Sequence, residues 1–387
     1  MKKIIDAVSN TKQTRLKSNV KTALVLSGGG SRGAYQCGVW QAMNELGITV
    51  DMVVGVSVGA LNGAMVVQGD QFLSAGLWRK LATDKVFDVK PDAQLSEFAI
   101  EFFKNGGAGS SGLQSLIQNF LDEDYVRKSE IDYGLLTVEF PSMKPHYLWK
   151  KDIPPGKLGD YIAASASAFP AVQTYSIDGK NYIDGGFENN MPIHMAVENG
   201  ASNIIAVYLK AAGRFDAAKE LSVSDNITLI CPEWDLGSFL VFDPENSAHI
   251  LRLGYLDAMK AFGVYEGKYY AFVKKEFKAR LLDGIDKLAY FFEFDPLILY
   301  NKKNFTSRLL DAIIENSKEH QALKETDLSA NTVKTLLRQL NKKNTVILIA
   351  KSLKEKGEGS IFSKSYVRKL MSAEIKAAQA LISFDIL

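Results

Sequence analysis

Residues 55–59 form the pentapeptide Gly-Val-Ser-Val-Gly, in which Ser57 stands between two glycines. An apolar run precedes the pentapeptide and a helical pattern rich in glycine and alanine follows it. A sharp strand-to-helix turn of this kind needs small neighbours, here Gly55 and Gly59. It also exposes the serine hydroxyl at a helix N-terminus, where the dipole favours developing negative charge. Ser57 is therefore the candidate nucleophile. The alternative is a tight turn with a serine N-cap.

A second glycine-rich segment, residues 28–33, also lies between an apolar strand and a helical pattern. Its consecutive glycines let backbone N–H groups converge on one point, as an oxyanion hole requires, and its arginine adds positive potential nearby. The candidate oxyanion-hole residues are Gly28, Gly29, Gly30, Ser31, Arg32 and Gly33. The alternative structural interpretation is a simple glycine-rich turn.

The same six residues spell the GxGxxG pattern of dinucleotide-binding proteins, with Asp51 as the candidate ribose-binding acid. In that fold the acid lies at the carboxyl end of the second strand, because ligands bind at the carboxyl edge of a parallel sheet. Asp51 lies at the beginning of the second predicted strand, whereas Ser57 follows its carboxyl end. The acid would lie at the wrong edge, so we favour the oxyanion-hole interpretation.

Asp184 precedes Gly185 and Gly186, directly after a predicted hairpin strand. An Asp-Gly pair is usually only a turn. A nucleophilic serine, however, needs a base within hydrogen-bonding reach, and two glycines let the backbone pack closely around a carboxylate that approaches Ser57. We therefore take Asp184 as the candidate base.

A histidine base, as in an ordinary Ser-His-Asp triad, is the main catalytic alternative. The sequence contains four histidines, at His146, His194, His249 and His320. In an α/β-hydrolase several strands precede the elbow, and the acid and then the histidine follow the serine. Here only one clear strand precedes the elbow strand. His194 and His249 satisfy the order, but both lie in helical patterns without loop signals, which suits surface or cap positions.

Alternating strands and helices must position these residues. Apolar strands are predicted at residues 22–27, 50–56, 133–140, 146–149, 203–209 and 227–231, with an Asp-Gly hairpin within 175–183. Helices are predicted at residues 35–46, 58–67, 73–81, 192–199 and 251–262, and a flexible loop at 105–112. Alternation of this kind requires right-handed parallel crossovers, so the predicted fold class is α/β, with a mostly parallel central sheet flanked by helices.

Beyond about residue 270 only helical periodicity is visible, for example over residues 333–340. We predict a polar arm over residues 1–20, a catalytic domain over 21–268 and a helical extension over 269–387. Phe98, Phe102 and Phe103 could form a mobile lid that meets lipid, but their helical spacing favours core packing.

Residues 301–387 contain 16 Lys and Arg against 9 Asp and Glu, a net charge of +7, which leaves −5 for the rest of a chain whose total is +2. Lysines surround the apolar segment at residues 346–350. Two interpretations follow for this tail: a helix that lies on an anionic membrane, or a helical bundle with surface lysines.

Length and composition limit the other possibilities. With 387 residues, of which 47% are hydrophobic, the chain can bury a large core, and a net charge of +2 gives no electrostatic reason to bind nucleic acid. Cys37 and Cys231 are too few for a disulfide framework and suit a reducing compartment as buried, small apolar residues. Clusters with metal-ligand spacing are missing from the sequence, and residues 122–124 suit a solvated helix end, so we expect neither metal nor cofactor.

No apolar run approaches the roughly 18 residues that a transmembrane helix needs, and the amino terminus lacks a signal-peptide core. The sequence therefore predicts a cytoplasmic protein that can visit a membrane surface. Secretion without a signal peptide leaves no mark in a sequence and stays open, as does the oligomeric state.

The glycine triplet with its x-Arg-Gly continuation, the early GxSxG and the later Asp-Gly-Gly resemble, in this order, the motifs of the patatin-like phospholipase family. The resemblance covers roughly residues 21–265, including the segments 163–170 (AASASAFP) and 243–258 (DPENSAHILRLGYLDA). It implies that Ser57 is the nucleophile, Asp184 the base and residues 28–33 the oxyanion loop. It also implies two-step acyl transfer, without a cofactor, on the esters of phospholipids, lysophospholipids or neutral glycerolipids. A lipid-binding protein of the same fold without turnover is the alternative.

Overall fold

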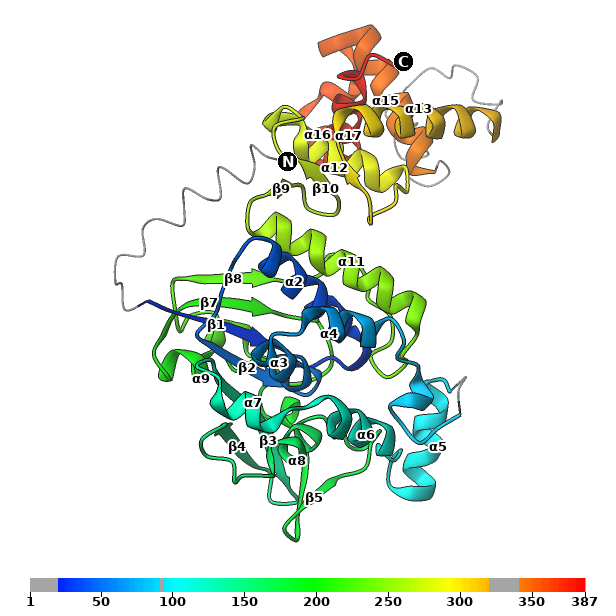
Figure 1. The fold of residues 1–387 in the computed structure, drawn as a ribbon. Coiled ribbons are helices and arrows are strands. Elements are labelled where there is room, and N and C mark those ends of the chain that lie inside the picture. Colours follow the sequence, from blue (N-terminus) through cyan, green and yellow to red (C-terminus); the bar gives the residue numbers. More distant parts are fainter. Residues whose placement is uncertain (1–19, 91–92, 320–340, 387) are drawn as a thin grey trace. The chain divides into compact units, whose positions relative to one another are not determined.

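The structure, a computed structural model, describes residues 20–90, 93–319 and 341–386. The chain divides into two compact units, the first ending at Ala261 and the second beginning at Phe262 (Figure 1). The predicted polar arm, apart from Val20, lies outside the described residues, as do His320 and the helical pattern at residues 333–340.

A single sheet of eight strands organises the first unit. Its strands are β1 (Lys21–Leu26), β2 (Met52–Val56), β3 (Asp132–Phe140), β4 (Lys144–Trp149), β5 (Tyr175–Ile177), β6 (Lys180–Asp184), β7 (Ala201–Val207) and β8 (Ile227–Ile230). The strand order is β5-β6-β3-β2-β1-β7-β8, and β4 also pairs with β3. The neighbours β3-β2-β1-β7-β8 are all parallel, whereas β4, β5 and β6 are attached by antiparallel pairing. The predicted α/β fold with a mostly parallel sheet is thus confirmed.

Strand β3 is long enough to serve several partners along its length. Its residues 134–139 pair with β4, while residues 132–136 pair with β2 and residues 137–140 with β6. Strand β4 pairs along one edge of β3, so β2 and β6 share the other edge of β3. Because β2 is parallel and β6 antiparallel to β3, these two strands run towards each other. Their last residues, Val56 and Asp184, pair with the consecutive residues Leu136 and Thr137. The ends of two strands that are far apart in the sequence therefore meet at one point of the sheet.

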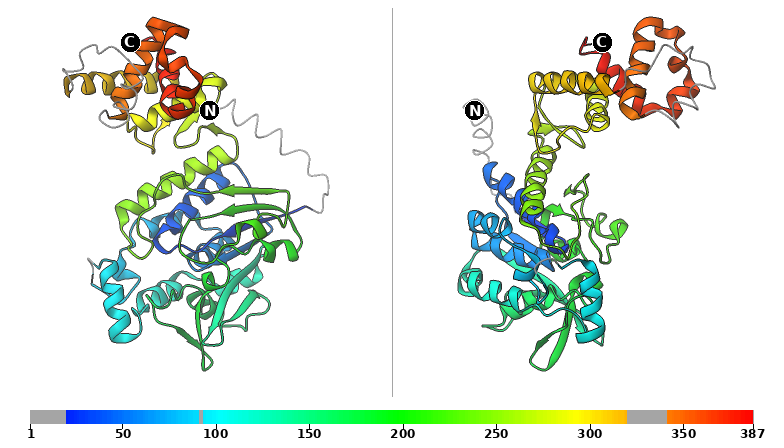
Figure 2. Two further views of the ribbon diagram at one scale, coloured as in Figure 1. Left: turned by 180° about the vertical axis from the view of Figure 1, so that it is seen from behind. Right: turned by 90° about the vertical axis from the view of Figure 1, so that its right-hand side faces the viewer.

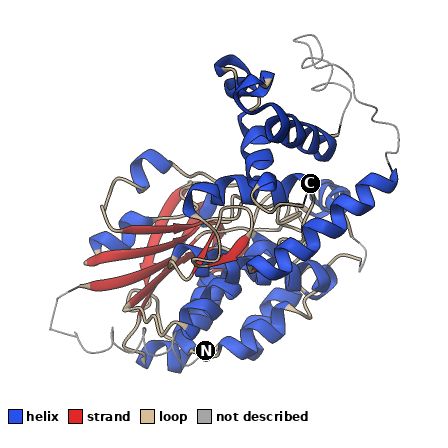
Figure 3. Cartoon of the chain, turned by 90° about the horizontal axis from the view of Figure 1, so that it is seen from above, coloured by secondary structure: helices blue, strands red, loops and turns tan. Residues whose placement is uncertain are grey.

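Helices flank the sheet of the first unit (Figures 1 and 3). They are α2 (Ala34–Glu45), α3 (Val58–Gln68), α4 (Gln71–Trp78), α5 (Leu95–Asn105), α6 (Ser111–Phe120), α7 (Glu123–Lys128), α8 (Leu158–Ser165), α9 (Ile193–Glu198), α10 (Ala217–Glu220) and α11 (Pro244–Ala261), with 3-10 turns η2 (Gly30–Gly33), η3 (Thr83–Lys85) and η4 (Gly185–Phe187). Met195 and Ala196 of α9 belong to the same core cluster as Val25 and Val54 of the sheet. Helix α3 packs on β1, β2 and β3, and α2 packs along α11. The central strands are accordingly buried on both faces, as continuous apolar runs predict.

Two local predictions for this unit hold, and a third needs correction. In the β5–β6 turn, Asp178 and Gly179 both have positive φ, 50° and 81°, which is the two-residue hairpin geometry that an Asp-Gly pair predicts. Asp122 caps α7 by accepting a hydrogen bond from the Tyr125 N–H at 2.9 Å, as expected of a solvated helix end. The loop predicted at residues 105–112 is shorter than expected, because α5 continues to Asn105 and α6 already begins at Ser111.

The second unit is mostly helical, which confirms the predicted helical extension, and it also contains three short strands that the sequence did not predict. Its helices are α12 (Leu282–Phe291), α13 (Lys302–Glu319), α15 (Lys342–Lys356), α16 (Ser365–Leu370) and α17 (Ser372–Ile382), with 3-10 turns η5 (Ala279–Leu281), η6 (Gly357–Gly359) and η7 (Ile361–Ser363). A small sheet, in the order β11-β10-β9, is formed by β9 (Tyr265–Glu266), β10 (Ala271–Val273) and β11 (Leu299–Tyr300). Strands of two or three residues are too short to show an alternating pattern.

The buried Asp286 carboxylate stabilises the loop before β10, because it accepts hydrogen bonds from three successive backbone N–H groups, those of residues 268–270.

The apolar segment of the basic tail lies inside the second unit. Val346, Ile349 and Ala350 of α15 are fully buried. Lys342 forms an ion pair with Glu374 of α17. These residues cannot insert into a membrane while they form the core of the unit, so the structure favours the bundle interpretation of the tail.

Of the two cysteines, Cys37 is buried and Cys231 is only half-buried, so the prediction of two buried residues holds for the first alone. None of the helices in the described ranges is both long and apolar enough to cross a bilayer.

Candidate functional site

Ser57 occupies the turn between β2 and α3 with φ 56° and ψ −127°, a strained conformation for a residue with a side chain. The two flanking glycines permit this turn by allowing close backbone contact. A Cβ atom on Gly55 would lie 2.2 Å from the Gly59 carbonyl oxygen, and one on Gly59 would lie 2.2 Å from the carbonyl oxygen of Leu26. The GxSxG spacing thus has a steric reason in this fold.

Ser165 holds the turn in place from the end of α8. Its hydroxyl accepts a hydrogen bond from the Ser57 N–H at 2.9 Å and donates one to the Leu136 carbonyl at 2.7 Å. The Ser165 side chain is fully buried. It therefore ties the strained serine to β3. Sequence reasoning assigned Ser165 no role, although it lies in the segment AASASAFP that carries part of the family resemblance.

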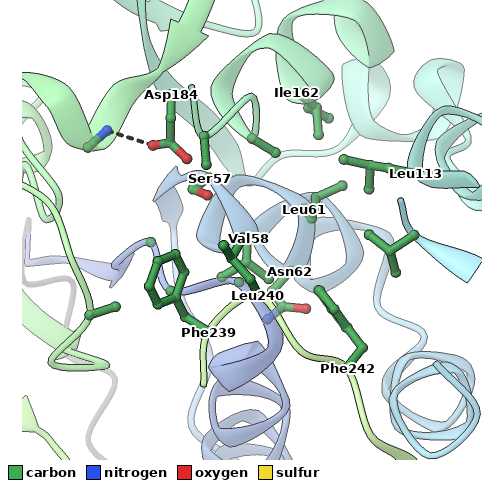
Figure 4. A pocket seen from close by; sticks show the side chains of 18 of the residues that line it. Ser57, Val58, Leu61, Asn62, Leu113, Ile162, Asp184, Phe239, Leu240 and Phe242 are labelled. Carbon is green, nitrogen blue, oxygen red and sulfur yellow. Dashed lines mark hydrogen bonds between the residues drawn. The ribbon is translucent and has the colours of Figure 1, made fainter. Parts of the chain in front are cut away.

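Asp184 lies beside Ser57 because β2 and β6 end at neighbouring positions of β3. The carboxyl group accepts a hydrogen bond from the Gly186 N–H at 2.7 Å and faces the Ser57 hydroxyl (Figure 4). Burial raises the pKa of Asp184 from 3.8 to about 6, and hydrogen bonding to Ser57 and to the Gly186 N–H opposes this rise. The carboxylate is thus more basic than an ordinary aspartate and still ionised at neutral pH.

The first three residues of the glycine loop line the same cavity as Ser57. The Gly28 N–H donates to the Asn190 backbone carbonyl at 3.2 Å and to its side-chain oxygen at 3.1 Å. Gly30 has φ 55°, and a Cβ there would lie 1.9 Å from the Phe239 carbonyl oxygen. Among the described residues, none accepts a hydrogen bond from the N–H of Gly29 or Gly30. These two donors remain free for a ligand.

The other three residues of the loop face away from the cavity. The Ser31 hydroxyl donates to the Ser238 carbonyl at 2.7 Å. The Arg32 guanidinium donates to the carbonyls of Gly237, at 2.9 Å, and Lys210, at 2.8 Å. Neither these two residues nor Gly33 lines the cavity. Arg32 therefore fastens the loops that surround the site, whereas we had expected it to add positive potential at the oxyanion.

Asn190 is a second residue that sequence reasoning missed. Its side chain is almost fully buried and bonds to both the N–H and the carbonyl of Gly28, at 3.1 and 3.4 Å. A Cβ on Gly186 would lie 3.0 Å from its side-chain oxygen. Asn190 thus fixes the distance between the glycine loop and the Asp184 segment. The sequence gives no signal for it beyond its place in an otherwise ordinary turn.

No histidine within the described ranges lines this cavity. The His194 Nδ1 pairs with the buried Glu220 carboxylate at 2.8 Å, which raises the pKa of the His194 imidazole. His146 contacts Glu139 on the sheet edge, and His249 is exposed on α11. The geometry therefore gives a Ser-His-Asp triad no support.

Asp51 lies at the opposite edge of the sheet from the glycine loop. Its carboxylate accepts a hydrogen bond from the Thr22 N–H at 2.8 Å, near the beginning of β1. The glycine loop follows the end of β1. Asp51 is thus far from a ligand on the loop, and the dinucleotide interpretation lacks its acid.

A cavity of about 530 Å³ extends from Ser57 and Asp184 into the unit (Figure 4). Its walls are mostly aliphatic and aromatic and come from α3, α4, α6 and the segments around residues 168–171 and 239–242. Leu61, Leu113 and Phe242 are among these apolar residues. The arrangement places the Ser57 hydroxyl and the Asp184 carboxyl side by side at the wall of a mostly apolar space, whose lining also includes the polar residues Asn62, Ser74, Asn190 and Arg214. Within the described part of the chain, no group of His, Cys, Asp and Glu could hold a metal ion.

The fold and the site define an α/β protein with a serine on a strand-to-helix elbow, a buried carboxyl beside it and an apolar cavity in front of both. Residues 24–197 match the patatin-like phospholipase family. The matched segment contains all three motifs, in the order on which the predicted resemblance rests.

Two curated relatives illustrate the similarity. Rat patatin-like phospholipase domain-containing protein 7 is 30% identical over 198 residues, which are 50% of this chain and 14% of that protein. Lysophospholipase NTE1 of Saccharomyces cerevisiae is 25% identical over 262 residues, 64% of this chain and 14% of that protein. The chain thus matches only about a seventh of the length of each relative.

Among solved structures, VipD from Legionella pneumophila matches with a TM-score of 0.41 and 14% sequence identity, over 95% of this chain and 90% of that chain. The type III effector protein ExoU matches with a TM-score of 0.33 and 14% identity, over 94% of this chain and 78% of that chain.

Proposed function

We propose that this protein is a lipid acyl hydrolase of the phospholipase A or lysophospholipase type. The observation that carries the proposal is the contact between the Ser57 hydroxyl and the buried Asp184 carboxyl at the wall of a large apolar cavity. The family match and relatives named as phospholipase-domain proteins and lysophospholipases support the same activity. A cavity of this size and polarity suits an acyl chain rather than a polar substrate.

In the proposed mechanism, Asp184 takes the proton of the Ser57 hydroxyl while the serine oxygen attacks the ester carbonyl carbon. The N–H groups of Gly29 and Gly30 stabilise the resulting oxyanion, together with the Val58 N–H, which has no acceptor within α3 because it is the first residue of that helix. The alcohol leaves with the proton from Asp184, and an acyl-serine ester remains. Asp184 then takes a proton from water as the water oxygen attacks this ester. It passes the proton to the departing Ser57 oxygen, which releases the fatty acid and restores the serine hydroxyl.

The test of this function is the release of fatty acid from a panel of phospholipids, lysophospholipids and neutral glycerolipids, with Ser57→Ala as the control. Labelling with a fluorophosphonate separates the proposal from its main alternative, a lipid-binding protein without turnover. An activated serine reacts covalently with this reagent, whereas a serine in a non-catalytic binding protein does not. Lack of both lipolysis and labelling would contradict the proposal.

We expect the activity to fall on the acid side of neutrality. The base must be ionised, and the pKa of Asp184 is raised to about 6. The kcat/KM for a soluble short-chain ester should therefore rise about tenfold per pH unit below pH 6 and level off above about pH 7. The pKa of the His194 imidazole is also raised, so an unchanged inflection in His194→Ala would exclude this histidine as its source. A flat profile down to pH 4.5 would exclude Asp184 as the base.

We further expect Ser165→Ala to slow the reaction and to destabilise the unit. The substitution leaves the buried Ser57 N–H and Leu136 carbonyl without their partner, which costs about 1–3 kcal/mol. If most of this free energy stabilises the elbow in its reactive conformation, kcat and the rate of fluorophosphonate labelling should fall by about 10- to 100-fold.

Ser167→Ala is the matched control for this substitution. Ser167 is also buried, but its hydroxyl donates to the Ala163 carbonyl, and its bond to the Asp184 N–H is made by the backbone carbonyl, which alanine keeps. Ser167→Ala should therefore change the melting temperature more than the labelling rate. Equal labelling rates for Ser165→Ala and the wild type, at a temperature where both are folded, would refute the positioning role.

A further inference from the structure

Helix α5 places much of its apolar surface in solvent. Phe98 is its one core residue, and its ring contacts Phe87 edge to face at a centroid distance of 5.3 Å. Phe103 is 85% exposed, Leu95 52% and Ile100 46%. The two interpretations of the phenylalanine cluster thus apply to different members, because Phe98 is a core residue and Phe103 is a surface residue.

The exposed apolar residues of α5 lie on one side of the helix. Leu95, Ala99 and Phe103 are spaced by four residues, and Ile100 lies beside them, with Ser96 as the polar residue on the same side. By the same spacing, the charged residues Glu97, Glu101 and Lys104 form a charged arc on another side of the helix. Single exposed apolar residues are common on protein surfaces, but several of them on one side of a helix are typical of an interaction site. We name the residues Leu95, Ala99, Ile100 and Phe103 the α5 face.

The end of α5 is joined to the wall of the cavity that contains Ser57. The Phe102 ring meets the Phe169 ring edge to face at 6.2 Å, and Phe169 lines the cavity. Two residues beyond Gly106, which ends the helix, the Ala108 N–H donates to the carbonyl of Ala171, another lining residue, at 2.9 Å. Two opposed views show α5 at the periphery of the first unit, with its neighbour α6 closer to the sheet (Figures 1 and 2). The α5 face thus connects to the cavity wall through Phe102, whose ring also contacts that of Phe103 at a centroid distance of 5.4 Å.

We propose that the α5 face docks the protein on a zwitterionic phospholipid bilayer and brings the cavity to the lipid. This inference rests on the proposed lipid hydrolase function. A helix of 11 residues is about 16 Å long, and its apolar face can lie in the plane of the interface with the aromatic side chain below the headgroups. The charged arc contains two glutamates and one lysine, so it gives no attraction to anionic headgroups. Burial of apolar side chains drives the binding.

The test uses the full chain in the Ser57→Ala background, so that the lipid is not consumed during the measurement. Binding to phosphatidylcholine vesicles is measured by flotation for this protein and for the same protein with Ile100→Ser and Phe103→Ser. We expect the double substitution to lower the partition coefficient at least tenfold. The matched control is Phe72→Ser, because Phe72 on α4 is equally exposed, at 88%, but lies outside the α5 face. This control should bind as well as its parent.

Two further measurements decide between lipid and other occupants of the α5 face. With Ser57 intact, Ile100→Ser with Phe103→Ser should lower hydrolysis of vesicle phospholipid at least tenfold and leave that of a soluble short-chain ester within twofold. Binding should also persist as salt rises. The inference is overturned by unchanged vesicle binding in the double variant, or by binding that requires anionic lipid and disappears with salt. A change from dimer to monomer caused by these substitutions without lipid would also overturn it.

These outcomes are distinct from a failure of the proposed function. A wild-type protein that hydrolyses neither soluble nor vesicular esters would contradict the hydrolase, whereas flotation of the Ser57→Ala protein would still decide whether the α5 face binds lipid.

Discussion

Ser57→Ala should abolish ester hydrolysis, with a loss of about 10⁴-fold or more in kcat, because it removes the atom that forms the acyl intermediate. The substitution should leave the fold unchanged. Ser57 is buried, and the hydrogen bond that fixes its backbone is made by its N–H group and therefore survives in alanine. Hydrolysis of a soluble ester, labelling by a fluorophosphonate and the melting temperature measure these three properties.

Ser74→Ala is the matched control for this loss. Ser74 is a buried serine that lines the same cavity, but it has no carboxyl partner like that of Ser57. Activity should remain within about tenfold of the wild type in this variant. Retention of more than about a tenth of the activity in Ser57→Ala would exclude it as the nucleophile.

Asp184→Asn should cause a loss of similar size, because an amide cannot take the proton of the serine hydroxyl. The two residues act on the same proton transfer, so their losses should not add. The double variant Ser57→Ala with Asp184→Asn should be no less active than Ser57→Ala alone. A histidine variant, His194→Ala, is the control for a different base and should keep its activity within about tenfold. A histidine variant as inactive as Asp184→Asn would restore the triad.

Asp184→Asn should also make the protein more stable above neutral pH. The pKa of Asp184 rises from 3.8 in the unfolded chain to about 6 in the folded protein, so the folded state binds this proton more tightly. The stability that Asp184 contributes is then complete below about pH 4 and is lost as the pH rises through 6. The shift corresponds to about 3 kcal/mol, which Asp184→Asn should recover.

Denaturant unfolding at pH 8 and at pH 4 measures this gain. Asparagine keeps an oxygen for the Gly186 N–H, so the hydrogen bond at 2.7 Å need not be lost. The variant should exceed the wild type in unfolding free energy at pH 8, and the difference should shrink towards pH 4. A variant that is less stable than the wild type at pH 8 would show that the ionised carboxylate is well solvated or well paired, and the pH profile of activity should then shift to lower pH as well.

The sequence alone determined the fold class and the three motifs. Buried parallel strands are continuous apolar runs, helices have a period near 3.6 residues, and tight turns need glycine, so β1, β2, α2 and α3 could be predicted within a few residues. Local chemistry also made Ser57 and Asp184 candidates. The sequence could not predict that the two side chains touch, because the residues around Ser57 contain no information about the position of Asp184, and the reverse is also true.

Tertiary structure decided that contact through β3, whose one edge receives the ends of both β2 and β6. Tertiary packing also brought in Ser165 of α8 and Asn190. Their partners are backbone groups of Leu136, Ser57 and Gly28, and such groups leave no trace in the pattern of side chains. It turned Arg32 towards carbonyls and away from the cavity. It buried the apolar segment of α15 and left Phe103 in solvent. Periodicity specifies which face of a helix is apolar, but the positions of the other elements determine what covers that face.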